Sequence, residues 1–292
     1  MDITTFMIAT YCLIDDFLAG QRLRKRGPRP TLRDSEVLTI EVLGEFLGID
    51  TESGIFTHFY RYYADWFPGL RKIHRTSFTR QAANLWKVKQ ELWRFLGQQI
   101  PHDPHISIVD SFPVPICRFA RANRCRSLRE VSAYGYDEVA RQTYFGLRAH
   151  VRLAWPGILV DCRLAPANIH DTEGAAELLE NVFGFALADR NYWKPELVQH
   201  LKAQGLYLLT PYKSSKREKQ PYPRRLTHMR YRIETVFGQL VERFHIKRVW
   251  ARDLWHLTSR WMRKFLSHTL AVFFCAFHQQ PSYLSFATLI HN

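Results

Sequence analysis

The pattern of hydrophobic residues in this chain changes at Pro101-His-Asp-Pro104. Before that segment, apolar residues recur at helical spacing, as in Ile3–Leu18 and in the stretch that opens at Asp34. The two prolines end the helical pattern, and short apolar runs typical of β-strands follow it. We therefore predict a helical region over residues 1–100, followed by a domain that contains a sheet.

The order of the expected elements predicts the fold class. The expected helices of the first region are 3–18, one from Asp34 to about 47, 51–63 and 77–98. The expected strands are 106–110, 143–153, 158–164, 185–189 and 206–210, and the later helices are 172–182, 193–204, 227–244 and 254–278. Strands that alternate with helices in this way indicate an α/β fold with helices on a mixed central sheet. We place this domain at 101–245 and a C-terminal helical extension at 246–292.

The chain is strongly basic, with 41 Lys and Arg against 27 Asp and Glu, a net charge of +14. Such a balance indicates an anionic partner, most often nucleic acid. The basic residues gather in three tracts: Arg22–Arg29; Arg118, Arg121, Arg124, Arg126 and Arg129; and Lys213, Lys216, Arg217, Lys219, Arg224 and Arg225. The alternative for each tract is a solvated surface. We expect the middle tract to flank the functional site, because it closely follows the apolar run that ends at Asp110.

The sequence also predicts the cellular location of the protein. The longest uncharged apolar stretch, Thr269–Phe277, is far shorter than the roughly 20 residues that a membrane span needs. Met1-Asp-Ile-Thr-Thr lacks the basic start of a secretory signal. The five cysteines are irregularly spaced, which argues against a disulfide framework. We therefore expect a cytoplasmic protein without a membrane segment.

Two apolar runs end in an aspartate, at Asp110 and at Asp189. The carboxyl ends of strands are where α/β sheets place their ligands. Pro113 and Pro115 follow the first aspartate, and we expect them to end that strand. Either aspartate alone would be interpreted as a loop cap, but two strands that end alike favour a shared site. Asp171 is the rival of Asp189, which we prefer because it ends a strand whereas Asp171 begins a helix.

A third carboxylate, Glu234, lies in the basic helix Arg230–Leu240, at the edge of its apolar stripe. Gly238, one turn later, would leave room beside it. The alternative is a surface pair between Arg230 and Glu234, worth about 0.3–0.5 kcal/mol. Three carboxylates brought together can hold two divalent metals, which clamp the attacking and leaving oxygens of a phosphodiester. Oxygen ligands suit Mg²⁺ or Mn²⁺.

These residues lie in four short motifs: Ile108-Val-Asp110-Ser, Ala167-Asn-Ile-His-Asp171, Ala188-Asp189-Arg-Asn-Tyr192 and Arg230-Tyr-Arg-Ile-Glu234-Thr-Val-Phe-Gly-Gln-Leu240. With them, most of the chain resembles the DDE transposases of bacterial insertion sequences. It is most similar to the insertion sequence nine-eighty-two family, a relative of the group typified by insertion sequences four and five. The last motif is the most specific of the four.

The resemblance implies a ribonuclease-H-like catalytic core between a helical DNA-binding region and C-terminal helices. It implies that Asp110, Asp189 and Glu234 are the catalytic triad and hold two Mg²⁺ or Mn²⁺ ions. The implied reaction is strand cleavage at the insertion-sequence ends followed by strand transfer into target DNA. The implied partners are terminal inverted repeats, target DNA and a second subunit in a homodimeric synaptic complex, in a bacterial cytoplasm at the nucleoid.

The candidate DNA-binding residues are Arg118, Arg121, Arg124, Lys213, Lys216, Arg217 and Arg230. Related families carry a Tyr-x2-Arg-x3-Glu-x6-Lys signature, which Arg230 and Glu234 fit. Thr227 and Val241 stand where the tyrosine and the lysine would be, so those two roles are not transferred. Two other interpretations stay open: another ribonuclease-H-like nuclease without strand transfer, and a DNA-binding protein without catalytic activity.

Overall fold

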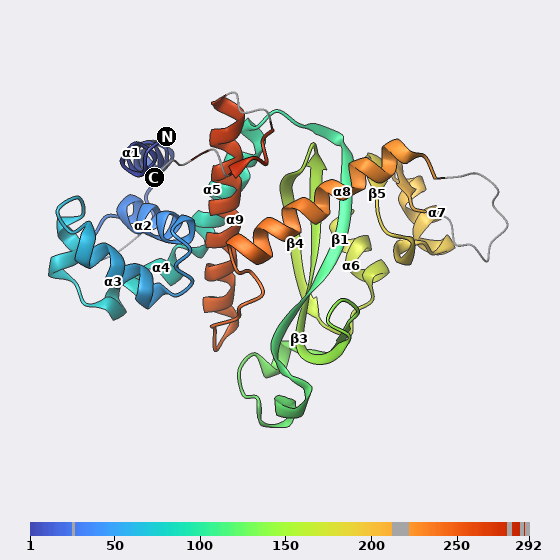
Figure 1. The fold of residues 1–292 in the computed structure, drawn as a ribbon, viewed down its shortest axis with the longest axis horizontal. Coiled ribbons are helices and arrows are strands. Elements are labelled where there is room, and N and C mark those ends of the chain that lie inside the picture. Colours follow the sequence, from blue (N-terminus) through green and yellow to red (C-terminus); the bar gives the residue numbers. More distant parts are fainter. Residues whose placement is uncertain (25–26, 212–221, 279–281, 287–288, 290–292) are drawn as a thin grey trace. The chain divides into compact units, whose positions relative to one another are not determined.

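The computed structural model describes residues 1–24, 27–211, 222–278, 282–286 and 289. The chain divides into two compact units (Figure 1). One, here called the helical unit, contains residues 1–99, 240–246 and 254–292. The other, here called the sheet unit, contains residues 100–239 and 247–253. The chain therefore leaves the helical unit near residue 100 and returns to it after the sheet has been built.

The helices of the helical unit are α1 (Ile3–Leu18), α2 (Asp34–Phe46), α3 (Glu52–Tyr62), α4 (Arg75–Asn84), α5 (Trp86–Gln99) and α9 (Leu254–Phe277). The single helix expected over 77–98 is thus two helices. Leu85 ends α4, and its N–H bonds to the Ala82 carbonyl only three residues back. No proline or glycine marks this break, which is why the apolar spacing did not reveal it. None of the helices in the described residues is long and apolar enough to cross a membrane.

Helix α9, at the C-terminal end of the chain, forms the centre of the helical unit. Almost every side chain from Leu257 to Cys275 is buried, including charged ones. Aromatic rings join it to the N-terminal helices: Phe265 lies 5.4 Å from Trp93 on α5, and Phe274 lies 5.3 Å from Phe6 on α1. Helix α9 therefore completes the core of the first hundred residues.

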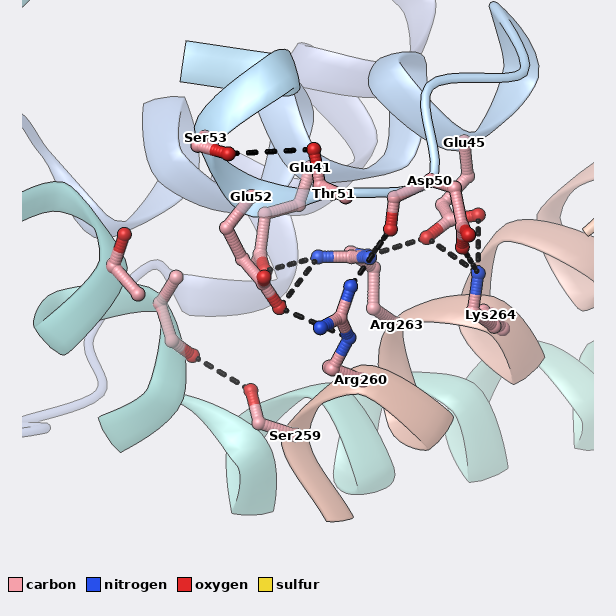
Figure 2. Close-up of polar contacts among 12 residues, drawn as sticks. Glu41, Glu45, Asp50, Thr51, Glu52, Ser53, Ser259, Arg260, Arg263 and Lys264 are labelled. Atoms are coloured by element: carbon pink, nitrogen blue, oxygen red, sulfur yellow. Dashed lines mark hydrogen bonds and ion pairs between the residues drawn. The ribbon is translucent and has the colours of Figure 1, made fainter. Parts of the chain in front are cut away.

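A network of buried charges connects α9 to α2 (Figure 2). It also connects α5 to α2. Arg263 Nε lies 2.6 Å from Glu45 Oε1, and Lys264 Nζ lies 3.0 Å from Glu45 Oε2. Lys89 Nζ lies 2.6 Å from Glu41 Oε2. Burial opposes the charge of Arg263, but the surrounding carboxylates outweigh burial and raise the pKa of Arg263. The network also includes Asp50, Glu52 and Arg260.

We predict that Arg263→Met lowers the free energy of unfolding of the helical unit by about 3–5 kcal/mol, because it leaves buried carboxylates without their cation. The matched control is Arg71→Met, which breaks the exposed pair of Arg71 with Asp65 and should cost less than about 1 kcal/mol. Urea unfolding of both variants measures the difference. Equal losses would contradict the assignment of this network as a main stabilising element of the unit.

The sheet unit is built on a mixed six-stranded sheet with β1 at its centre. The strands are β1 (Asp103–Arg118), β2 (Ala133–Asp137), β3 (Gln142–Trp155), β4 (Ile158–Pro166), β5 (Gly184–Leu187) and β6 (Leu206–Leu209). Strand β3 pairs antiparallel with β1, β2 and β4, while β5 runs parallel to β1 and to β6. This order, with helices before and after it, confirms the predicted α/β class and is consistent with a ribonuclease-H-like core.

Strand β1 is longer than expected, since it continues through Pro113 and Pro115 to Arg118. Its parallel pairing with β5 ends at Ile108, whereas its antiparallel pairing with β3 continues. Beyond Asp110 the strand therefore has an unpaired edge, and a proline that lacks an N–H is tolerated there. The expectation that the prolines end the strand at Asp110 was wrong for this reason.

The two faces of the sheet are covered by different helices. Helices α6 (Asp171–Leu178) and α7 (Pro195–Ala203) bury one face in a core that contains Val109, Ala186 and Leu206. Helix α8 (Arg224–Gly238) crosses the other face (Figure 1) and packs Phe237 on Phe112, with ring centroids 4.8 Å apart. Alternation along β1 therefore directs Asp110 toward the α8 face and Ser111 toward the α6 face.

Candidate active site

Asp110 and Asp189 lie on neighbouring strands and on the same face of the sheet. Ile108 of β1 pairs with Leu187 of β5, and each aspartate follows two residues later. Because side chains alternate with a period of two, both carboxylates point toward the α8 face. The two carboxylates are close enough to interact, since the charge of Asp189 raises the pKa of Asp110. The structure thus brings together two of the three carboxylates that the sequence singled out.

The carboxyl group of Asp110 is unusually hard to ionise. Burial is the main cause and raises its pKa to about 7, and the charges of Asp189 and Asp171 add to the rise. A hydrogen bond that the Ser111 N–H donates to Asp110 Oδ1, 2.8 Å long, and the charge of Arg230 both oppose it. A buried carboxyl group whose pKa is raised beside other carboxylates forms a centre that favours a bound cation.

Asp189 lies just beyond β5 and precedes the short 3-10 turn Arg190–Tyr192. Its main-chain carbonyl accepts a hydrogen bond from the Tyr192 N–H at 3.0 Å, while its side chain makes no capping hydrogen bond to this turn. The turn is therefore held by the backbone. The half-buried carboxylate of Asp189 does not have to cap it.

Helix α8 brings Arg230 to the site and holds Glu234 one turn further on. Ile233 and Val236 are the buried side chains that fix the helix on the sheet. Arg230 is close enough to Asp110 to lower its pKa. Arg230 Nη2 lies 3.8 Å from Glu234 Oε1, and the Glu234 side chain is 52% exposed. Glu234 thus lies on the site-facing edge of α8 without meeting the two aspartates.

These residues have the right chemistry for a hard divalent metal, although the third carboxylate stays apart. Among the described residues, no group of three His, Cys, Asp or Glu side chains forms a ready metal site. Asp110 and Asp189 nevertheless offer oxygen ligands, and Mg²⁺ is commonly bound by one or two carboxylates together with the phosphates of its substrate. The donor set therefore fits such an ion.

Asp171, the alternative to Asp189 as the second carboxylate, lies on the opposite face of the sheet, beside Ser111. It is the first residue of α6, and His170 is the N-cap. Ser111 Oγ donates a hydrogen bond to Asp171 Oδ1 at 2.6 Å, and Arg148 Nη1 lies 3.1 Å from the same oxygen. The charge of Asp171 is thus compensated on the α6 face, behind Asp110.

No sequence pattern singled out Arg148 or His150, which together with Tyr192 surround Asp171 and Ser111. Arg148 Nη1 also donates to Ser111 Oγ at 3.2 Å. Burial raises the pKa of Tyr192 well above its usual value, and the charges of Asp110 and Asp171 add to the rise. Arg148 and His150 lie in mid-strand of β3, where only the register with β1 places them beside the site.

The basic tracts expected to bind DNA are placed as follows. Arg118, Arg121 and Arg124 are exposed at the end of β1 and in the 3-10 turn after it. Eight residues of strand separate Arg118 from Asp110, a span of roughly 26 Å, so this tract does not flank the carboxylates as we had expected. Lys213, Lys216 and Arg217 lie outside the described residues.

Comparison with known proteins assigns the family. Residues 102–253, more than half of the chain, match the family model described as "Transposase DDE domain". The chain belongs to this family of transposases, enzymes that cut and join DNA. No curated protein matches the chain. Among solved structures it is similar to that titled "Cryo-EM structure of piggyBac transposase synaptic complex with hairpin DNA (SNHP)", with 10% identity, a TM-score of 0.41, and coverage of 98% of this chain and 83% of that one.

We predict that Arg148→Met lowers the free energy of unfolding of the sheet unit by about 2 kcal/mol, because charged hydrogen bonds of this kind contribute roughly 1.5–3 kcal/mol. Arg163→Met, which removes an exposed arginine of β4, is the matched control and should have a small effect. Urea unfolding compares them. A loss no larger than that of the control would show that the Arg148–Asp171 pair does not support the site.

His150 makes the sheet unit sensitive to acid. Burial is the main cause and, together with the nearby charge of Arg148 and against the opposing effect of Asp171, lowers its pKa to about 4. The unfolded chain, with a histidine pKa of about 6.5, binds more protons between pH 6.5 and 4. The contribution of His150 is therefore fully present above pH 6.5. It is lost as the pH falls toward 4, by at most about 1.4 kcal/mol per pH unit.

We predict that His150→Gln flattens this dependence, whereas His200→Gln on the exposed face of α7 does not. Urea unfolding at pH 7, 5.5 and 4.5 measures the slope in each protein. If the wild type and His150→Gln lose stability equally between pH 6.5 and 4.5, His150 is not held neutral in the folded protein.

Proposed function

We propose that this protein cleaves DNA strands at the ends of an insertion sequence and joins them to target DNA, using Asp110, Asp189 and Glu234 with divalent metal ions. The observation that carries the proposal is the placement of Asp110 and Asp189 on one face of adjacent strands, beside Arg230. Membership of the transposase DDE family supports the reaction class. The triad and the order of the two steps are our assignment.

In this proposal Asp110 and Asp189 hold Mg²⁺ or Mn²⁺, two ions in the complete site. Bound ions activate water and stabilise the charge on the leaving oxygen. Arg230 binds the phosphate next to Asp110, since a guanidinium offers paired donors to phosphate oxygens. No covalent intermediate with the protein is needed, and Tyr192, whose pKa is raised well above its usual value, stays a neutral neighbour of the carboxylates.

Glu234 completes the ligand set when DNA binds. Its ion pair with Arg230 is long, and the glutamate is half exposed, so the pair contributes no more than about 0.5 kcal/mol. A DNA phosphate that binds Arg230 would break this ion pair and release Glu234 at little cost in free energy. This coupling would assemble the third carboxylate only on the substrate and would suppress metal-dependent chemistry without DNA.

The remaining parts of the proposal come from the resemblance to bacterial insertion-sequence transposases. The DNA partners are terminal inverted repeats and target DNA, and the ends are held by a homodimer. Arg118, Arg121, Arg124, Lys213, Lys216 and Arg217 contribute phosphate contacts outside the active site. The working place is a bacterial cytoplasm, at the nucleoid.

The experiment is cleavage of labelled duplexes that carry the DNA flanking this reading frame, with Mg²⁺ and with EDTA. We expect metal-dependent nicking at the repeat ends. Asp110→Ala, Asp189→Ala and Glu234→Ala should each reduce it by at least about 100-fold, beyond what residues outside the ligand set usually contribute. Glu180→Ala, which removes an exposed carboxylate in the turn after α6, is the control and should cleave normally.

The outcomes separate the alternatives. Cleavage without strand transfer into a target plasmid would favour another ribonuclease-H-like nuclease. Salt-sensitive binding without cleavage by the wild type would favour a DNA-binding protein without activity. Full activity of Asp189→Ala together with loss in Asp171→Asn would move the second carboxylate to Asp171.

A further inference from the structure

A concave surface outside the carboxylate site lies on the α8 face of the sheet, at the edge of α8 opposite Glu234. It is a groove of about 650 Å³ between the first half of α8 and the strand ends that begin β1 and end β3. Its walls include Ile106 and Trp155 from the strands, and Arg225, His228 and Arg232 from the helix. We call it the α8 groove.

The α8 groove carries positive charge that the described part of the protein does not neutralise. Within those residues, no carboxylate forms an ion pair with Arg225 or Arg232. Asp103 also lines the groove, but its Oδ1 accepts a hydrogen bond from the His105 N–H at 2.9 Å. Arg225 and His228 are exposed. An anionic ligand would therefore meet two available guanidinium groups and an imidazole.

One of these cations is held in place. The Arg232 guanidinium carbon lies over the Trp155 ring, 6.0 Å from its centroid, at the outer limit of a cation–π contact. This contact limits the rotamers of a long side chain before any ligand arrives. A planar guanidinium that is positioned in advance loses less entropy for each hydrogen bond it makes to a phosphate.

The α8 groove is also at the right distance from the carboxylates to act on the same DNA. Ile106 and Asp110 lie on the same face of β1, and their four-residue separation spans about 13 Å. Along the axis of B-DNA, one strand advances about 3.4 Å per nucleotide. The strand also turns by about 36° per nucleotide, so phosphates two nucleotides apart on one strand are separated by about 13 Å. A strand with its scissile phosphate at Asp110 therefore places a phosphate about two nucleotides away over the groove.

We propose that the α8 groove binds the phosphodiester backbone of the cleaved DNA about two nucleotides from the scissile phosphate, through Arg225 and Arg232. The inference rests on the proposed function for its DNA partner, and it assigns a phosphate-binding site outside the carboxylate centre. Arg230 and Arg232 then contact the same backbone from two edges of one helix. Trp155 keeps Arg232 in position.

The test uses the full-length protein and a duplex that carries the flanking DNA, with affinity measured by fluorescence anisotropy in EDTA over a salt series. Arg225→Gln with Arg232→Gln should reduce the slope of log affinity against log salt by about 1.8, which is 0.9 for each lost phosphate contact. The matched control is Arg163→Gln with Lys202→Gln. It removes the same charge from exposed positions on β4 and α7 and should leave most of the slope intact.

Arg232→Lys separates charge from folding, because it keeps a cation in the groove and should keep the slope near the wild-type value. Ethylation interference locates the contact: modified phosphates about one to three nucleotides from the cleavage site should inhibit the wild type but not the double variant. Equal slopes for the groove variant and the control would overturn the proposal, as would interference that is unchanged in the double variant.

These outcomes are distinct from failure of the proposed function. Metal-dependent cleavage by a protein whose groove variant binds like the control would overturn the groove and leave the catalytic assignment intact. Loss of slope and of interference in the groove variant supports the groove even where strand transfer is not detected. Binding of DNA that is insensitive to salt in the wild type would overturn the groove outright.

Discussion

The pairing of β1 with strands of opposite direction is the constraint on which the sheet unit depends. On one side β3 follows β1 antiparallel as far as Arg118, and on the other β5 runs parallel only as far as Ile108. Asp110 therefore lies just after the parallel pairing of β1 with β5 ends, and the chain turns away from the sheet after Asp189. The same strand sends Ser111 to the opposite face, so one dipeptide links the carboxylate centre to its support on α6.

The two units treat buried charge in opposite ways. In the helical unit, the cations of α9 meet carboxylates at hydrogen-bonding distance, as Arg263 and Lys264 do with Glu45. At the candidate site, the charge of Asp189 adds to the effect of burial on Asp110, the charge of Arg230 opposes it, and the pKa of Asp110 rises to about 7. A buried carboxyl group whose pKa is raised beside a second carboxylate is a typical candidate for a functional metal site.

Much of the architecture could be predicted because its signals are local. The strands expected over 143–153 and 158–164 and the helix expected over 172–182 follow from proline, glycine and apolar spacing. The structure places β3, β4 and α6 close to these residues. The strand through Pro113 could not be predicted, because a proline is tolerated only where a neighbouring strand is missing. The break at Leu85 left no mark, since the apolar spacing of α4 continues into α5.

The sequence by itself determined most of the order of elements, the basic character and the two aspartates that follow apolar runs, because periodicity, charge and turn residues are properties of neighbours along the chain. Only the tertiary structure decided that α9 completes the N-terminal helices, that Arg148 compensates Asp171, and that Glu234 pairs with Arg230 and stands apart from the aspartates. Some of those facts depend on contacts between segments more than two hundred residues apart. Register and burial set such contacts, and neither is encoded at any single position.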